Sequence, residues 1–481
     1  MKRKDDNTYT NATKYVKTQF EKSPFTRYII NKGNEFETNV IQQLKDKGHP
    51  VVSVSNVITP ETVEKTKELM RLHVPIIHSA PVVNEVNKTR GIVDLLVRSD
   101  YVNHIVKKVP PIDQAEKPFY IVIDVKFTTL ELSANNVNIL NSRKFRAYKF
   151  QVLVYTLAIG QIQGFTSRYA YLLGRRINHR GTTSLDCFSQ LGVIDFKGFD
   201  ENIELFYDNP LVPINDISEI WSCGVKQQAI AVGKGVTSWR DPRFCAQLIE
   251  EHATKGKVID AILNVNRSTE AVVLPDAVST NLYDWKTTTS EAFVDFEIFC
   301  DVCHLFEYTN NIFMIGVWYE GSYYCFSANS ISLDEEKRIM LEFMKFLEEK
   351  KITKLWYWYA DKGMWNRRLR TGVVETDYMS SVAWYDMHVI FKSEPIVIKG
   401  CFKFGLKEIA TALYNHKLIT TKLDGTCTNG LDAGLKCYLE LAKPVNEQSS
   451  ELMTAVKKYN QFDVEVLSDV MRFLREKYIK N

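Results

Sequence analysis

The sequence predicts a mixed α/β protein in which a small helical module joins two α/β domains. Short runs of β-branched and aromatic residues, typical of buried strands, alternate with amphipathic stretches of helical period. The 481 residues suffice for roughly three domains. A hydrophobic content of 45% and a charged content of 25% are ordinary for a globular protein. We therefore expect domains over 1–205, 206–285 and 286–481.

The first domain is expected to contain helices and strands in the order α-β-β-α-β. A polar start of about 24 residues, which we expect to fray, precedes an amphipathic helix over 34–47 and a polar helix near 60–72. The remaining predicted elements are strands over 91–100 and 119–132, a buried helix over 149–160 and a strand over 167–176. This pattern is typical of one α/β domain that ends near residue 200.

The middle segment, 211–272, consists of short helical pieces that Gly224, Gly233 and Gly235 interrupt. It is either a packing element between domains or a helix-Gly-helix hairpin that offers backbone N–H groups to phosphate. The last domain begins near residue 290. It is expected to contain a meander of strands over 291–299, 311–320 and 322–328, then a helix over 334–351, a strand over 354–360 and further helices.

A carboxylate and an amine share one face of the strand 119–132. Side chains two apart on a strand point the same way, so Asp124 and Lys126 lie together. Asp94, in the preceding strand, would lie close to Asp124, and adjacent carboxylates repel unless a cation intervenes. A hard divalent ion such as Mg²⁺ prefers such oxygen ligands, and Lys126 would then orient or deprotonate its water. The alternative is a buried ion pair between Asp124 and Lys126.

A second set of acids lies in the last domain. Asp295 and Glu297 share one face of the strand 291–299, whereas Tyr459 and Asp463 are four apart on one face of a helix. Asp361 ends the strand between them. Four carboxylates from separate segments suit two Mg²⁺ ions roughly 3.5–4 Å apart, the arrangement used for phosphoryl displacement. Taken alone, the two acids of the strand would also fit carboxylates at the rim of the sheet, and Tyr459 would also fit a core tyrosine.

The first set of residues resembles the RecB-like branch of the PD-(D/E)xK nucleases. Asp94, D-x-K at Asp124 and Lys126, and Q-x-x-x-Y at Gln151 and Tyr155 follow in the order of that family. The resemblance implies a restriction-endonuclease-like fold, in which the glutamine and the tyrosine contact substrate or steady the lysine.

The RecB-like branch also carries an acid in its first helix. Glu37 fits that place and Glu35 is its rival, so the resemblance implies Glu37, Asp94 and Asp124 as metal ligands. The proline that names the family is absent, because Val93 stands before Asp94.

The second set resembles the tyrosine subgroup of the DEDD exonucleases, which have an RNase H-like fold. D-x-E opens that pattern and Y-x-x-x-D closes it, and the segment 402–413 is similar to a helix of such domains. The resemblance implies that Asp295, Glu297, Asp361 and Asp463 hold metal and that Tyr459 orients the attacking water. The family's usual asparagine before the middle aspartate is missing. Alternatives to Asp361 are Asp386, which helix capping also explains, and Asp432.

Together the halves resemble predicted RecB family nucleases that carry an RNase H-like exonuclease domain, encoded by bacteria and large DNA viruses. The resemblance implies Mg²⁺ or Mn²⁺ as cofactor, nucleic acid as substrate with DNA favoured over RNA, and a separate helicase or replication and repair proteins as partners. No stretch approaches the ~18 apolar residues of a membrane span and no secretory signal is evident, so we expect an intracellular protein, in the cytoplasm or nucleus of a host cell if viral.

Other observations limit these expectations. A net charge of +3 argues against binding nucleic acid by bulk charge alone, although basic runs at 142–149 and 174–180 could do so locally. The CDVCH pattern at 300–304 matches haem attachment, which we attribute to coincidence. The alternative functions are a nucleic-acid-binding scaffold with inactive centres and a structural or assembly protein.

Overall fold

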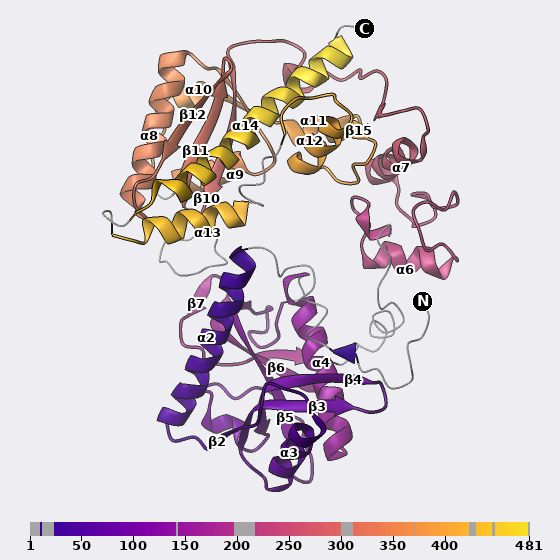
Figure 1. The fold of residues 1–481 in the computed structure, drawn as a ribbon, viewed down its shortest axis with the longest axis vertical. Coiled ribbons are helices and arrows are strands. Elements are labelled where there is room, and N and C mark those ends of the chain that lie inside the picture. The colour runs from indigo at the N-terminus through magenta and orange to yellow at the C-terminus, as the bar shows by residue number, and fades with distance from the viewer. Residues whose placement is uncertain are drawn as a thin grey trace. The chain divides into compact units, whose positions relative to one another are not determined.

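Both halves of the chain fold as mixed α/β units (Figure 1). The computed structural model describes residues 10–11, 24–140, 143–196, 217–299, 311–370, 372–422, 430–444 and 448–479. These residues form two compact units, Met1–Asp208 and Asn209–Asn481. Most of the polar start and the CDVCH run lie outside the described residues.

An eight-stranded sheet organises the first unit. Its main path runs β2 (Val51–Ser53), β3 (Ile76–Asn84), β4 (Thr89–Arg98), β5 (Tyr120–Glu131), β6 (Tyr169–His179) and β7 (Thr182–Ser184), while β1 (Thr10–Asn11) pairs with β4 and β8 (Gly192–Asp195) with β6. The central strands β3, β4 and β5 are antiparallel, and β5 and β6 are parallel. Parallel neighbours need a crossover, which α4 (Arg143–Gln163) supplies.

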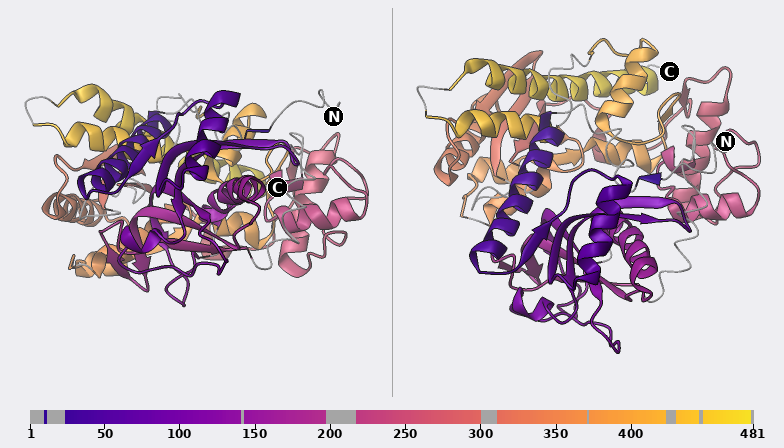
Figure 2. Two further views of the ribbon diagram at one scale, coloured as in Figure 1. Left: turned by 90° about the horizontal axis from the view of Figure 1, so that it is seen from below. Right: turned by 60° about the horizontal axis from the view of Figure 1, so that its bottom comes forward.

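Helices cover both faces of this sheet (Figure 2). On one face, α2 (Pro24–Asp46) buries Val40 and Leu44 against Leu95 of β4. On the other face, α4 buries Val152 and Ile159, and α3 (Pro60–Arg71) packs in the same hydrophobic core. A short 3₁₀ turn, η1 (Val102–His104), follows β4. The strands between these layers are apolar on both faces, which is why their sequences read as nearly continuous hydrophobic runs.

The predicted helices and strands of the first unit are confirmed, but the short strands β1, β2, β7 and β8 and the longer β3 were not expected. The predicted strands over 91–100 and 119–132 are β4 and β5, and that over 167–176 is β6. In β3, His78, Ser79 and Pro81 interrupt the apolar pattern. Ser79 has a φ of 52°, yet the register continues past it, because His78 pairs with Leu95 and Ala80 pairs with Val93. Tertiary pairing therefore makes a strand where local pattern does not.

A five-stranded sheet organises the second unit. Its order is β12 (Ser322–Ser327), β11 (Ile312–Tyr319), β10 (Glu291–Ile298), β13 (Lys354–Tyr357) and β14 (Ala383–Asp386). The first three strands form the predicted antiparallel meander, and β13 and β14 run parallel to β10. One face packs on α8 (Leu333–Lys350), α9 (Asp361–Leu369) and α10 (Asp377–Ser381), and the other on α13 (Gly430–Leu441) and α14 (Ser450–Ile479).

The segment that the sequence suggests as a connecting module packs within the second unit. It contains η2 (Ile217–Glu219), α6 (Val225–Gly233), α7 (Ala253–Arg267), β9 (Val273–Leu274) and η3 (Leu282–Asp284). Its neighbours are α11 (Met387–Ser393), β15 (Val397–Ile398), which pairs with β9, and α12 (Leu406–Asn415). Ile259 and Leu263 of α7 share one hydrophobic core with Ile390, Leu413 and Val470. The module therefore buries its apolar side chains against the helices of the last domain.

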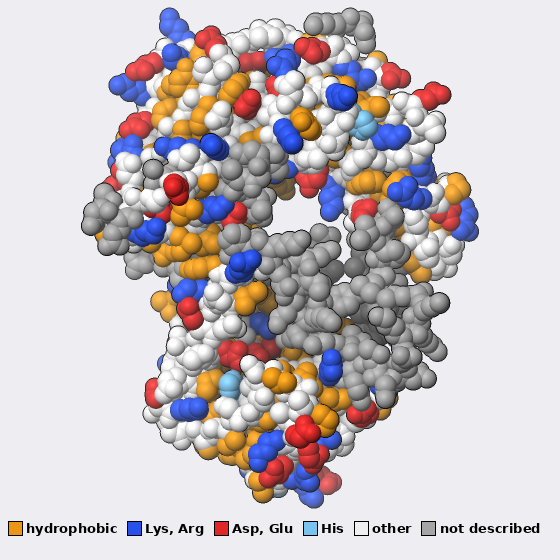
Figure 3. Space-filling view, viewed as in Figure 1, with side chains coloured by type: hydrophobic (Ala, Val, Ile, Leu, Met, Phe, Trp, Pro, Cys, Tyr) orange, Lys and Arg blue, Asp and Glu red, His pale blue; other side chains and the backbone are white. Residues whose placement is uncertain are grey.

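On the face drawn in Figure 3, Lys and Arg side chains alternate with acidic ones in each unit, as a net charge of +3 suggests. None of the described helices combines the length and the apolarity that a bilayer span requires.

A buried ion pair joins the end of α14 to the start of β10. Arg475 Nη2 donates to Glu291 Oε2 at 2.9 Å, and Arg475 Nε donates to the Trp285 carbonyl at 2.9 Å. The side chains of Arg475 and Glu291 are only 17% and 8% exposed. Because removal of Arg475 leaves a buried carboxylate unpaired, we expect Arg475→Ala to lower the free energy of unfolding by about 3 kcal/mol.

Urea denaturation followed by tryptophan fluorescence measures this effect in the second unit alone, since all eight tryptophans lie there. The matched control is Arg472→Ala, whose side chain is 55% exposed and pairs with Asp469. It should change the free energy of unfolding by less than about 1 kcal/mol. Equal effects of the two substitutions would contradict the role given to Arg475.

Candidate functional site

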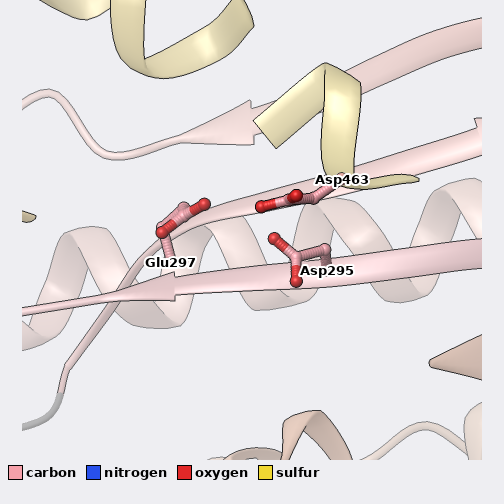
Figure 4. A group of neighbouring side chains, drawn as sticks. All are labelled: Asp295, Glu297 and Asp463. Atoms are coloured by element: carbon pink, nitrogen blue, oxygen red, sulfur yellow. The ribbon is translucent and has the colours of Figure 1, made fainter. Parts of the chain in front are cut away.

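Three carboxylates of the second unit converge on one point. Asp295 and Glu297 project from the same face of β10, and Asp463 projects toward them from α14 (Figure 4). One carboxylate oxygen of each lies within 4.8 Å of the others. Glu297 and Asp463 are buried, and Asp295 is half-buried. The two acids of the strand and the aspartate of the helix therefore lie together, as their spacing in the sequence predicts.

A glycine and an asparagine allow α14 to approach β10 this closely. Asp295 pairs with Gly316 of β11, and a Cβ at that glycine would lie 1.8 Å from Asn460 Oδ1. The fully buried Asn460 donates through Nδ2 to Asp295 Oδ2 at 3.0 Å and to the Asp295 carbonyl at 3.2 Å. Its Oδ1 accepts a bond from Tyr323 Oη at 3.0 Å. Asn460 therefore fixes the orientation of the Asp295 carboxylate, which sequence reasoning missed.

Asp361 lies beside this trio without belonging to it. It opens α9 directly after β13, is buried, and accepts a hydrogen bond from the Phe296 N–H of β10 at 2.9 Å. Its competitor Asp386 caps α11 by accepting from the His388 N–H at 3.0 Å, which is the structural explanation given for it above. Asp432 is 3.2 Å from Lys436 of its own helix. Of these alternatives, Asp361 is the one that accepts a hydrogen bond from the backbone of the acid-bearing strand.

Burial and mutual repulsion act on all four acids. The pKa of Asp295 is raised to about 7 by burial and then by Asp361, and that of Asp463 to about 7 by burial and then by Asp295. Burial raises the pKa of Asp361 to about 7 and holds that of Glu297 well above its usual range. These shifts report a site with too little positive charge for its acids.

The donor set fits a hard divalent cation. Glu297 Oε1 and Asp463 Oδ1 are buried and accept no hydrogen bond from any residue that the structure describes. Buried polar atoms ordinarily have a partner, so these oxygens are free for one. All the candidate ligands are carboxylate oxygens, which Mg²⁺ and Mn²⁺ bind and which a cation would relieve of repulsion.

Lys407 supplies the positive charge nearest to the trio. From α12, its ammonium donates to Tyr459 Oη, lies 3.7 Å from Asp463 Oδ2 and sits 3.8 Å from the centroid of the Tyr459 ring. Tyr459 is buried, and burial followed by Asp463 raises its pKa. The phenol therefore stays protonated, with its position set by Lys407. The helix of Lys407 was singled out in the sequence, but this lysine was not.

The first unit places Asp94 against β5. The pairing of β4 with β5 ends at Leu95 and Ile123. Beyond that point, Asp94 Oδ2 accepts the backbone N–H of Val125 at 2.7 Å. Burial and the neighbouring Asp124 raise the pKa of Asp94 well above its usual range. The two aspartates are thus close, as adjacent strands predict.

Lys126 is held between an acid and the crossover helix. Its Nζ lies 2.6 Å from Oδ2 of the fully buried Asp124 and donates to Gln151 Oε1 at 3.1 Å. Gln151 Nε2 in turn donates to Tyr155 Oη at 2.9 Å. Burial alone would lower the pKa of Lys126, but Asp124 and Asp94 together raise it. The glutamine and the tyrosine of α4 therefore steady the lysine.

Glu37, rather than Glu35, faces this cluster. Its charge contributes to the raised pKa of Asp94, and its Oε1 lies 3.1 Å from Nε2 of His78. Glu35 is exposed and pairs with Lys32 at 2.6 Å. Among the described residues only the trio of the second unit brings three carboxylates within 4.8 Å, so the acids of the first unit are more widely spread around Lys126 than that trio.

A scan against protein-family models finds no match for this chain, and a search of curated proteins finds none either. The two groups of carboxylates, with the amines and amides that hold them, are therefore the observations from which a function can be proposed.

The close passage of Asn460 over Gly316 generates a test. In Gly316→Ala the new Cβ would displace Asn460, so we expect a free energy of unfolding lower by about 1–3 kcal/mol and a smaller stabilisation by Mn²⁺. Gly363→Ala is the control, because no atom lies within 4 Å of its Cβ and alanine favours a helix by up to about 1 kcal/mol. Tryptophan fluorescence in urea, with and without Mn²⁺, measures both. An unchanged Gly316→Ala variant would refute the argument.

The raised pKa values predict how stability depends on pH. Asp295 and Asp463 titrate near 3.8 when unfolded and at about 7 when folded, so the folded chelator-treated protein binds more protons between these values. Its stability should fall as pH rises from about 4 to about 7. Mn²⁺ must displace those protons, so the stabilisation it confers should grow over the same range.

Urea midpoints at pH 5, 6, 7 and 8, with chelator or with Mn²⁺, measure both trends. The double variant Asp295→Asn, Asp463→Asn is the control, and both its pH dependence of stability and its stabilisation by Mn²⁺ should be much smaller. If the wild type and the control show the same dependence on pH, the shifts assigned to these two carboxyls are wrong.

Proposed function

We propose that the chain is a Mg²⁺- or Mn²⁺-dependent nuclease whose principal centre is in the second unit. The observation that carries this proposal is the convergence of Asp295, Glu297 and Asp463 within 4.8 Å, with buried oxygens that lack partners among the described residues. Asp361, at the start of α9, lies against β10, where it accepts the Phe296 N–H. Acids gathered from β10, α9 and α14 suit a site that binds cations and a phosphodiester.

Each residue of this centre has a role that its contacts support. Asp295, Glu297, Asp361 and Asp463 would hold the divalent ions, which when bound supply an activated water and charge stabilisation at phosphorus. Asn460 keeps the Asp295 carboxylate turned toward them. Other residues act next to the ions.

Tyr459, held by Lys407, presents its hydroxyl to the water that attacks phosphorus. Lys407 is 26% exposed, so its ammonium is available to a phosphate oxygen as well. The strand order β12-β11-β10-β13-β14, antiparallel and then parallel, supports the resemblance to RNase H-like exonucleases.

A second centre of the PD-(D/E)xK kind is proposed for the first unit. Asp94, Asp124 and Glu37 would bind metal, and Lys126, steadied by Gln151, would orient water or neutralise phosphate charge. The crossover helix between β5 and β6 supports the resemblance to RecB-like nucleases. DNA is favoured as substrate over RNA, with a helicase or replication and repair proteins as separate partners.

One observation favours a second candidate function for the first unit. Lys126 lies 2.6 Å from Asp124 and partly satisfies that acid without any metal. A unit of this kind could bind nucleic acid without cutting it. The cation near the substrate would then be Lys126, together with Arg175, whose guanidinium lies 4.5 Å from the Phe127 ring in the neighbouring strand.

A nucleic-acid cleavage assay with the wild type and two variants tests the proposal. Wild type, Asp124→Asn and Asp295→Asn are incubated with Mn²⁺ and with 5′- or 3′-labelled DNA or RNA. We expect Asp295→Asn to lose about 10²-fold or more of the trimming from 3′ ends, because one metal ligand is gone. Asp124→Asn should lose the products of the other centre and keep this trimming.

The outcomes separate the candidates. No cleavage of DNA or RNA by folded wild-type protein would contradict the nuclease proposal. Cleavage that only Asp295→Asn abolishes would assign catalysis to the second unit and binding to the first.

A further inference from the structure

One exposed aromatic residue stands beside the acid centre in a strained conformation. Tyr359 has a φ of 70° and 72% of its surface is exposed. Left-handed backbone is uncommon for residues other than glycine and is costly for a bulky one. A large apolar ring in water adds a second cost, because burial of such a ring is ordinarily favourable. Neither cost is explained by packing, so the position suits a ring that receives a ligand.

The place of Tyr359 in the fold connects it to the acids. It lies two residues after the end of β13 and two residues before Asp361, so its Cα is at most about 7.6 Å from that of Asp361. Trp356 pairs with Phe293, two residues before Asp295, so β13 ends level with the acids of β10. In sheets of this kind ligands bind beyond the carboxyl ends of parallel strands, where Tyr359 stands.

Fixed neighbours hold the strained residue. The Tyr359 N–H donates to Asp386 Oδ1 at 2.9 Å, which gives Asp386 a second role beside its cap on α11. The His388 ring meets the Tyr359 ring edge to face at 5.2 Å. Trp358 anchors the turn through Nε1, which donates to the Phe404 carbonyl at 3.2 Å. The residue is therefore held by contacts on one side while most of it stays open to solvent.

We propose that Tyr359 is a stacking platform for the terminal base of a single strand whose end enters the acid centre. The inference rests on the proposed nuclease function and adds to it one residue that would bind the unpaired strand end. Every base has a π face, so stacking on a tyrosine selects unpaired ends with little regard to sequence. A base inside a duplex is already stacked on its neighbours and cannot lie on this ring without unpairing.

Three substitutions in the full chain test the platform. Tyr359→Gly removes the ring and also the strain, since glycine adopts a φ of 70° readily. Tyr359→Phe keeps the ring. Lys351→Gly is the control, because Lys351 has a φ of 55° at the end of α8 and forms no part of the centre.

Single-stranded DNA with a 3′-terminal 2-aminopurine reports stacking, because its fluorescence is quenched against an aromatic ring. We expect Tyr359→Gly to lose the quenching and to raise KM for the single strand about 10-fold or more, with kcat nearly unchanged. Its thermal midpoint should equal or exceed that of wild type, which a purely structural tyrosine would not produce. Tyr359→Phe and Lys351→Gly should retain the wild-type quenching and KM.

The results distinguish this inference from the function beneath it. If wild type cleaves but Tyr359→Gly shows unaltered KM and quenching, the platform is refuted while the nuclease proposal stands. If wild type cleaves blunt duplex as readily as single strands, the substrate class is wrong. If folded wild type cleaves neither, the proposed function fails and this inference fails with it.

Discussion

Repulsion among buried carboxylates is the constraint on which the second unit depends. Asp295, Glu297 and Asp463 are brought together by β10 and α14, whose other side chains form an apolar core. The packing of that core fixes the distances between the acids, so burial and then mutual repulsion raise their pKa values. Lys407 offsets only part of it. Divalent cations would remove the rest, and this is the basis of the proposed nuclease function.

In the first unit, the positive charge of a lysine side chain offsets part of the repulsion between the acids. Lys126 lies on the same strand face as Asp124 and is held there by Gln151, so its charge partly compensates the acid before any metal binds. Asp94 instead accepts the backbone N–H of Val125, beyond the point where the pairing of β4 with β5 ends. The two units thus differ in how much charge a metal would have to supply. This difference is why we place the principal centre in the second unit.

Much of this arrangement could be predicted from the sequence, because strand and helix periods decide which side chains share a face. The spacing of Asp295 from Glu297 and of Tyr459 from Asp463 is of that kind. Asn460 and Lys407 were not found, since their roles depend on contacts with residues far away in the chain. The strand β3 and the attachment of the segment 206–285 to the second unit were missed for the same reason, because both depend on tertiary packing.

Anomalous X-ray scattering from crystals of the full chain grown with Mn²⁺ tests the central claim most directly, because it locates the ion without reference to activity. The account predicts an anomalous peak bounded by the carboxylates of Asp295, Glu297 and Asp463, and its loss in Asp295→Asn crystals. Crystals at saturating Mn²⁺ that show no peak at these three acids, or a peak that survives the substitution unchanged, would contradict it.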